Sequence, residues 1–252
     1  MQYERLQYIM NSAKEKKFVS VEDVAQQLNV SLMTVRRDLN HLCNQGQLER
    51  CYGGARLPQL IVPEIEYDEK LQRNLNTKAR IAKKALELIE EGDAVYLDSG
   101  TTIAELAKLI GKERKNVAVV TCDLNTATLL AKCGTSVTVV GGVLNNITNS
   151  VSGHASDQFL RQFRFSKAFL GASCIDYNFD TFSPNADKAH LKRLAAELSG
   201  KTYVAVDSSK FYNSAMIFIS SLNQYAGVIT DREFSKAEWK TLHEKNINII
   251  PV

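Results

Sequence analysis

A polar segment in the C-terminal half of the chain has the residue types of an anion-binding loop: Leu97-Asp98-Ser99-Gly100-Thr101-Thr102. It follows a predicted strand and opens a predicted helix. Loop amides, the positive end of the helix dipole and the hydroxyls of Ser99, Thr101 and Thr102 would all favour an anion. A helix N-cap with nothing bound explains the same residues. The spacing is neither Gly-x-x-x-x-Gly-Lys nor Gly-x-Gly-x-x-Gly, so neither NTP nor NAD binding is expected.

Other polar residues and glycines stand where further predicted strands end. Open α/β sheets bind ligands at the carboxyl ends of their strands, so these positions are candidates for the same site. They are Thr121, Gly141, Gly142, Gly153, Asp207 and Lys210, together with Lys192 on a helix that follows a polar loop. Simpler interpretations stay open, because glycines make turns, Lys192 can be solvated and Asp207 can pair with Lys210.

A third group of candidates lies on one helix near the N-terminus. Its apolar side is predicted to hold Leu32, Val35, Leu39 and Leu42. Arginine pairs with guanine and asparagine with adenine, so the opposite side suits DNA. The predicted base contacts are Met33, Thr34, Arg36 and Arg37, and the predicted phosphate contacts are Ser31 and Asn40. A three-helix bundle with an ordinary solvated face is the alternative.

Two further helical patterns come before this helix, and the three predict a helix-turn-helix. Apolar residues at helical spacing mark the first pattern within 6–13 and the second within 21–28. Ser20 and Asp23 have the spacing of a capping box at the start of the second. Ser31 is placed to cap the third helix and Gly46 to end it. Short extended segments are expected at 48–50 and 51–52.

The remainder alternates between strand and helix patterns, which predicts a mainly parallel α/β sheet. Strands are expected at 94–97, 117–121, 137–140, 167–170, 203–206 and 227–230. Helices are expected at 78–91, 102–110, 125–132, 188–198 and 236–245. The predicted organisation is a DNA-binding domain over 1–56, a linker over 57–76 with two prolines and no clean periodicity, and a second α/β domain over 77–252.

Composition excludes several classes of protein. The 252 residues are 44% hydrophobic and 23% charged, which is ordinary for a globular chain. Five scattered cysteines without a Cys-x-x-Cys pair argue against a disulfide framework and a zinc ribbon, and no metal, cofactor or catalytic residue is expected. No apolar run is long enough for a membrane span and no signal peptide is evident, so a cytoplasmic location is expected. The net charge of +3 does not by itself announce nucleic-acid binding.

The N-terminal strings resemble the DeoR family of bacterial repressors. Ser31-Leu32-Met33-Thr34-Val35-Arg36-Arg37-Asp38-Leu39 is similar to the family's Ser-x-x-Thr-(Ile/Val)-Arg-Arg-Asp-Leu recognition helix, and Gly53-Gly54-Ala55 to its Gly-Gly-Ala signature. The resemblance implies a winged helix-turn-helix in which Gly53 and Gly54 turn the chain out of the wing and Arg50 and Arg56 lie near phosphates. Residues 1–56 hold eight basic and six acidic residues. Affinity should therefore depend on dimerisation and base contacts more than on bulk charge.

The resemblance runs through the second domain, where the family binds a phosphorylated sugar or sugar derivative. It implies that Gly100, Thr101 and Thr102 hold the phosphate. It also implies that the sugar is framed by Asp98, Lys192, Asp207 and Lys210. Two strings depart from the family pattern, since Cys122 replaces the usual Asn and 185–190 replaces an acidic run. The identity of the effector is left open.

Two alternatives to a ligand-controlled repressor are considered. The second domain also resembles ribose-phosphate isomerases, which carry Gly-Ala-Asp-x-x-Asp. The first carboxylate is Ser173 here and the second is Asp176. A serine cannot act as a general base without activation, so an enzyme is not expected. A ligand-independent DNA binder is the other alternative.

The prediction is a cytoplasmic, dimeric or tetrameric repressor of a sugar or sugar-acid catabolic operon. Its expected partners are operator DNA and a phosphorylated sugar, whose effect would be expressed through residues 57–76.

Overall fold

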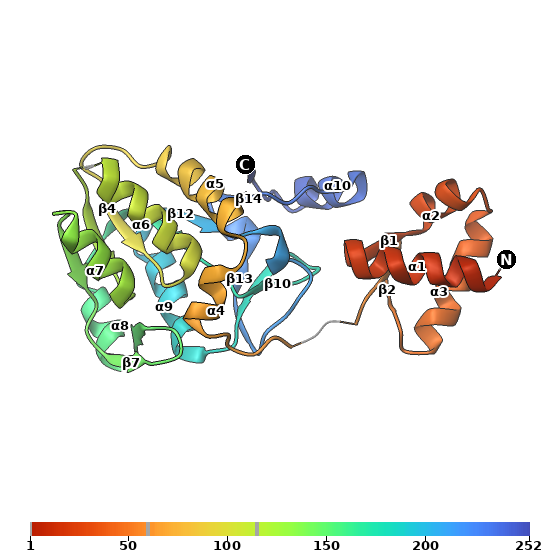
Figure 1. Ribbon diagram of the computed structural model, residues 1–252, viewed down its shortest axis with the longest axis horizontal. Helices are drawn as coiled ribbons and strands as arrows, with labels where there is room; N and C mark the ends of the chain where they lie inside the picture. The colour runs from red at the N-terminus through yellow and green to blue at the C-terminus, as the bar shows by residue number, and fades with distance from the viewer. Residues whose placement is uncertain (1, 59–60, 114–115) are drawn as a thin grey trace. The chain divides into compact units, whose positions relative to one another are not determined.

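The computed structural model describes residues 2–58, 61–113 and 116–252. The chain forms two compact units, Met1–Leu60 and Ile61–Val252, and each is described by itself. Figure 1 shows the elements of both units in chain order. Within the described residues, no helix combines the length and the apolar character needed to cross a bilayer.

Unit 1 consists of three helices and a small antiparallel sheet. Its elements are α1 Gln2–Lys16, β1 Phe18–Ser20, α2 Val21–Leu28, α3 Leu32–Asn44, β2 Glu49–Cys51 and β3 Gly54–Arg56. The strands lie in the order β1-β3-β2, so β2 and β3 form the wing and the unpredicted β1 holds it against the helices. Ser20 caps α2 by accepting from the Glu22 and Asp23 amides. The three helices were predicted correctly.

The two wing glycines lie elsewhere in the wing than the resemblance implied. Gly53, with φ of +77°, is in the turn between β2 and β3, while Gly54 begins β3 opposite Cys51. A side chain on Gly54 would meet the backbone oxygen of Val19 at 2.0 Å, because β3 is the central strand. The glycines therefore form the tip of the wing rather than its exit.

The core of unit 1 lies between the helices and the sheet. Val35, Leu39 and Leu42 of α3 are buried there as predicted, but Leu32 is 44% exposed because it stands in the first turn. Asp38 of α3 is fully buried and forms an ion pair of 2.7 Å with Arg5 of α1. The family string Arg-Arg-Asp-Leu therefore contributes two residues to the interior of this unit.

Unit 2 is built on a seven-stranded parallel sheet with the order β15-β14-β12-β9-β4-β5-β6. The strands are β4 Ala94–Leu97, β5 Ala118–Thr121, β6 Val137–Val139, β9 Phe165–Leu170, β12 Ser199–Ala205, β14 Gly227–Thr230 and β15 Ile249–Pro251. This confirms the predicted α/β class. The edge strand β15 was not predicted.

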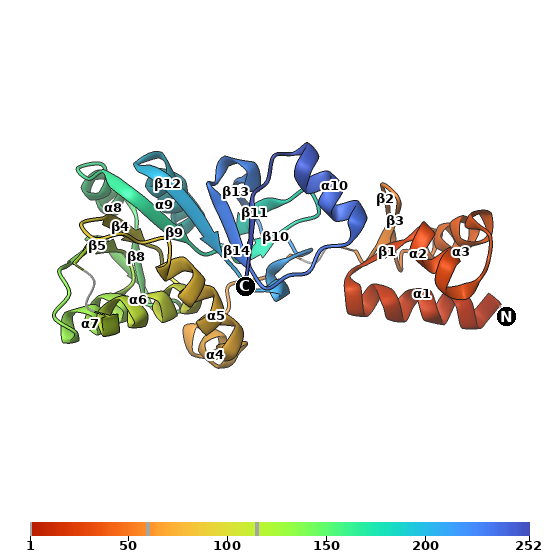
Figure 2. The ribbon, with the colours of Figure 1, turned by 90° about the horizontal axis from the view of Figure 1, so that it is seen from above.

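Alternate residues of each strand face opposite sides of the sheet, and helices cover both sides. Val95 and Leu97 of β4 pack in one cluster with α5 Leu75–Leu86, α6 Thr101–Glu113 and α7 Leu124–Lys132. Tyr96 of β4 packs in the other cluster with α8 His154–Leu160 and α9 Ala186–Glu197. Figures 1 and 2 show these two helical layers. Helix α10 Lys236–Glu244 joins the second cluster through Leu242.

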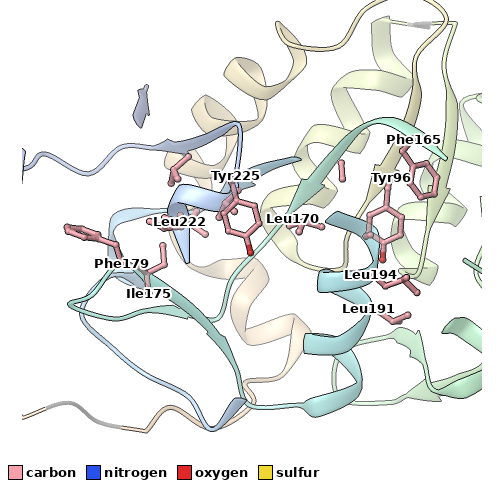
Figure 3. Packing of buried hydrophobic residues seen from close by; sticks show 14 of the residues in the cluster. Tyr96, Phe165, Leu170, Ile175, Phe179, Leu191, Leu194, Leu222 and Tyr225 are labelled. Carbon is pink, nitrogen blue, oxygen red and sulfur yellow. The ribbon is translucent and has the colours of Figure 1, made fainter. Parts of the chain in front are cut away.

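Two smaller antiparallel pieces were not predicted. One is a sheet of β10 Cys174–Ile175, β11 Asp180–Ser183 and β13 Ile217–Ser221; the other is a hairpin of β7 Val143–Asn145 and β8 Ser150–Ser152. Figure 3 shows the second cluster extending from Tyr96 on the large sheet to Ile175 on the small sheet and Phe179 in the turn that follows. Short strands of two to five residues give too little alternation to predict from sequence.

The segment 57–76, predicted as a linker, contains regular structure. Helix α4 Tyr67–Gln72 lies within it and α5 begins at Leu75. Tyr67 is buried and its amide donates to the carbonyl of Ile147 at 3.0 Å, a usual hydrogen-bond distance. The C-terminal part of this segment is therefore part of unit 2.

Candidate DNA-binding face and ligand cavity

The N-terminus of α3 is fixed by its own polar residues. Ser31 caps the helix by accepting from the Thr34 amide at 3.2 Å, and the two hydroxyls are 2.9 Å apart. Both side chains are therefore engaged locally. A phosphate or a base edge near this turn would either replace the hydrogen bond between the Ser31 and Thr34 hydroxyls or form an additional one.

The outer side of α3 carries long side chains in solvent. Met33 is 75% exposed, and Arg36, Arg37 and Asn40 are exposed as well. Among the described residues, neither arginine forms an ion pair with a carboxylate. The two guanidinium groups therefore keep their donors available for an external acceptor, which is what base or phosphate contact requires.

The wing adds a second exposed set. Arg50 of β2 is exposed, whereas Arg56 of β3 is partly buried and its Nε lies 3.2 Å from Glu49 Oε2. Tyr52, in the turn beside Gly53, is 96% exposed. Tyr52 was not among the predicted contacts, although its position directly before two glycines could have marked it as an exposed aromatic residue in a turn.

A cavity of about 70 Å³ lies in unit 2 at the carboxyl ends of β4, β9 and β12. It is lined by the loop that opens α6, by the loop after β9, by α9, by the segment before α4 and by residues near the end of β12. The lining residues with polar side chains are Glu64, Lys70, Ser99, Thr101, Thr102, Ser173, Lys188, Lys192 and Lys210. Six of the predicted site residues are brought together here: Ser99, Gly100, Thr101, Thr102, Lys192 and Lys210.

The loop that opens α6 has the backbone that its glycine permits. Gly100 has φ of +136°, a conformation that other residues rarely adopt, and its carbonyl accepts from the Ala104 amide at 2.9 Å. Burial raises the pKa of the neighbouring Asp123, and the hydrogen bond of 2.7 Å from the Thr126 amide opposes that shift. The two threonines that follow Gly100 line the cavity.

Asp98 acts behind the cavity wall. Its carboxylate is buried, pairs with Lys192 and accepts from the Gly171 amide at 2.9 Å. Lys192 also donates to the Gly171 carbonyl at 2.8 Å. The pair holds the ammonium at the cavity and neutralises part of its charge, so Asp98 orients a lining residue without lining the cavity itself.

The other predicted residues do not line this cavity. Thr121 is fully buried and accepts from the Asp123 amide at 3.1 Å. Asp207 is buried and accepts from the Ser209 amide at 3.0 Å and from Asn74 Nδ2 at 3.2 Å, which places it at the start of the short helix η1 Ser208–Lys210.

The predicted glycines lie near the β7–β8 hairpin. The Gly141 carbonyl accepts from Ser156 Oγ at 2.6 Å, and Gly142 has φ of +150° with Ser156 close by. Gly153 lines a separate hollow with His154, Asp157, Arg161, Asp187 and His190. None of these three glycines lines the cavity of unit 2, and Gly153 is the N-cap of α8.

Three charged cavity residues were not predicted, namely Glu64, Lys70 and Lys188. Glu64 forms ion pairs with Lys70 at 3.2 Å and with Lys188 at 3.4 Å. Burial lowers the pKa of Lys70, and the charge of Lys188 adds to that shift. Two of the three residues come from the predicted linker, where no motif marks them, and only the tertiary structure brings them to the cavity.

The two positions that correspond to isomerase carboxylates are separated. Ser173 lines the cavity, whereas Asp176 does not. The Asp176 carboxylate accepts from the amides of Asn178 and Asp180 at 2.8 and 2.9 Å, and burial raises its pKa. Among the described residues, no group of three or more His, Cys, Asp or Glu side chains is arranged to hold a metal ion.

Solved structures with a similar arrangement are remote. Ribose 5-phosphate isomerase A of Methanocaldococcus jannaschii is 17% identical, with a TM-score of 0.42 over 55% of each chain. The delta subunit of eIF2B from Chaetomium thermophilum is 21% identical, with a TM-score of 0.48 over 65% of this chain and 58% of its own.

Sequence relatives are much closer. The HTH-type transcriptional regulator FruR of Bacillus subtilis and the glycerol-3-phosphate regulon repressor of Escherichia coli are each 33% identical, over 91% of this chain and 91% of their own. The lactose phosphotransferase system repressor of Streptococcus mutans is 33% identical over 90% and 91%. Residues 5–60 match the DeoR-like helix-turn-helix domain and residues 73–232 match the DeoR C-terminal sensor domain. The chain therefore belongs to the DeoR family of transcriptional regulators.

Proposed function

We propose that this protein represses a sugar or sugar-acid catabolic operon and that a phosphorylated sugar, bound in the cavity of unit 2, changes its affinity for the operator. The observation that carries the proposal is the meeting of four lysines with the Ser99–Thr102 loop in one cavity. A phosphoryl group is the ligand part that such a set of donors favours. The relatives, which include a glycerol-3-phosphate regulon repressor, support the same class.

Operator binding is assigned to unit 1. In this proposal Met33, Arg36 and Arg37 of α3 contact base edges, while Ser31, Thr34, Asn40, Arg50 and Arg56 are closer to phosphates. Thr34 moves from the predicted base contacts because its hydroxyl pairs with Ser31. Two copies would bind paired half-sites, as dimers or tetramers.

A sensor is favoured over an isomerase by the position of the carboxylates. Asp176 accepts from backbone amides and does not line the cavity, and the residues of the Gly171–Asp176 string that do line it are Gly171, Ala172 and Ser173, none of which carries a carboxylate. Proton transfer between sugar carbons needs a positioned base in reach of the substrate. We expect sugar phosphates to bind without being converted.

The test measures operator affinity with a panel of sugar phosphates and their unphosphorylated counterparts. The operator is first selected from random DNA with the full chain. One phosphorylated sugar should shift operator affinity by about 5- to 150-fold, while the free sugar has no effect. The same panel should yield no isomerised product. An operator affinity that no sugar phosphate changes would contradict the proposal, and so would product that scales with protein concentration.

A further inference from the structure

The Glu64 carboxylate is held inside the ligand cavity by two lysines. Its oxygens lie 3.2 Å from Lys70 Nζ and 3.4 Å from Lys188 Nζ. All three side chains are largely buried, with 14%, 19% and 11% exposed for Glu64, Lys70 and Lys188. An anion from the chain itself therefore occupies this end of the cavity.

Positive charge is in excess around that carboxylate. Four lysines line the cavity, and Glu64 is the acidic residue among the lining residues. The pKa of Lys70 is lowered by burial and by the charges of Lys188 and Lys210, even though Glu64 opposes the shift. Asp98 pairs with Lys192, but Asp98 and Glu64 together still leave a net positive charge on the four lysines, so an anion of higher charge would be favoured in place of Glu64.

The cavity has two separate sets of anion donors. The first is the loop with Ser99, Thr101 and Thr102, which opens α6. The second is the Lys70–Lys188 pair, supplied by α4 and α9. A phosphoryl group on the loop leaves the second set free for another anionic group of the same ligand.

Glu64 belongs to a short segment with few other attachments. Residues 62–65 line the cavity, and the Val62 amide donates to the Ser214 carbonyl at 2.8 Å. In the sequence this segment comes directly after unit 1. Displacing Glu64 would remove two ion pairs that hold the first residues of unit 2. A conformational change passed along the chain from unit 2 to unit 1 must go through these residues.

We propose that the natural ligand carries two anionic groups, as a sugar bisphosphate or a phosphorylated sugar acid does, and that its second anion replaces Glu64 between Lys70 and Lys188 and releases residues 62–65. This inference rests on the proposed function. Because the ligand and Glu64 compete for one pair of lysines, ligand binding and release of the segment are coupled in both directions. The Ser99–Thr102 loop sets the affinity for the phosphate, and the competition with Glu64 for Lys70 and Lys188 selects for a second anionic group.

The test uses calorimetry on the full chain with matched ligand pairs that differ by one anionic group. Suitable pairs are fructose 6-phosphate with fructose 1,6-bisphosphate, and glucose 6-phosphate with 6-phosphogluconate, which distinguish a second phosphate from a carboxylate. In at least one pair the doubly anionic member should bind roughly tenfold more tightly, the worth of one hydrogen bond to a charged group. Glu64→Gln should increase that ratio several-fold, and Lys188→Met should bring it close to one.

A matched control and a second measurement separate displacement from a general change of charge. Glu66→Gln removes the same charge from an exposed position that does not line the cavity, and should leave the ratio unchanged. Amide hydrogen exchange at Val62 should become faster when the doubly anionic ligand binds, and should already be fast in Glu64→Gln without ligand.

Three results would overturn the inference. They are equal affinity within every pair, an equal gain for both members in Glu64→Gln, and Val62 exchange that no ligand alters. These results leave the proposed function intact as long as monophosphates bind and shift operator affinity. If no sugar phosphate binds at all, both the inference and the proposed function fail.

Discussion

The outer side of α3 and the cavity of unit 2 differ in how their cationic side chains are stabilised. On α3, Arg36 and Arg37 are exposed, and the structure pairs neither with a carboxylate among the residues it describes. In the cavity, Lys192 is paired with Asp98, and Lys70 and Lys188 are paired with Glu64. Water stabilises an unpaired cation at the surface, but a buried cation needs an anion nearby. Exposed arginines can therefore stay unpaired until DNA binds, whereas buried lysines need an internal carboxylate while no ligand is bound.

The same contrast has a consequence for regulation. An exposed arginine gains contacts when DNA arrives and loses none. In the proposed mechanism, Lys70 and Lys188 exchange one anion for another, so Glu64 is released when the ligand binds. This difference makes the cavity, and not the DNA-binding face, suited to switching.

The largest expected effect is a loss of stability in the hydrophobic core of unit 1, behind α3. Leu39→Ala, at a fully buried position of unit 1, should cost about 2–5 kcal/mol of stability. A domain of this size has little to spare, so unit 1 should unfold at a lower temperature while unit 2 keeps its transition. Calorimetry of unfolding would resolve the two transitions. Leu32→Ala, at a 44% exposed position, is the control and should change little; a single transition shifted as a whole would refute the independence of the units.

The loop is tested by Thr101→Val, which keeps the shape of a largely buried side chain and removes its hydroxyl. Losing a hydrogen bond to a charged group should weaken sugar-phosphate binding by about 1.5–3 kcal/mol, with operator binding in the absence of ligand near wild type. Thr138→Val, at a half-buried position of β6 outside the cavity, is the control. Unchanged ligand affinity in calorimetry would mean that the loop only caps α6.

The DNA-binding face is tested by Arg37→Ala. Operator binding should fall by about 1–3 kcal/mol, and base preference should relax at one position of the site. Titration by fluorescence anisotropy against operators substituted at single positions measures both effects. Lys201→Ala removes the same charge from an exposed position in unit 2 and should have little effect. Full affinity and specificity in both Arg36→Ala and Arg37→Ala would remove α3 from the interface.

The smallest expected effect is a dependence of stability on pH. Burial lowers the pKa of Lys70 from its ordinary 10.5, so the folded protein loses that proton before the unfolded chain does. Over the interval between the lowered pKa and 10.5 the unfolded state binds more protons, and the free energy of unfolding should rise with pH. Denaturant unfolding of the wild type and of Lys70→Met checks the sign. A difference between the two proteins that is flat or falls as pH rises would contradict it.

The candidate DNA-binding face on α3 could be predicted from the sequence because its positions lie on one helix. Its candidates span 31–40, and a period of about 3.6 residues separates the outer positions from Val35, Leu39 and Leu42. The error at Leu32 arose because the first turn of a helix can project beyond the core. Gly53 and Gly54 were recognised as wing residues, but the central position of β3 decided which part of the wing they occupy.

Only part of the cavity lining could be predicted from the sequence. The sequence by itself determined the α/β class, the loop that opens α6 and the presence of lysines after strands, because strand-then-helix patterns and glycine-rich turns are local signals. The tertiary structure decided which strand ends meet. It placed Asp98 behind the cavity lining, left Thr121, Asp207 and the three glycines outside the cavity, and brought Glu64, Lys70 and Lys188 to it. Side chains from distant segments become neighbours only through the strand order and helix packing of unit 2, and no local period records that.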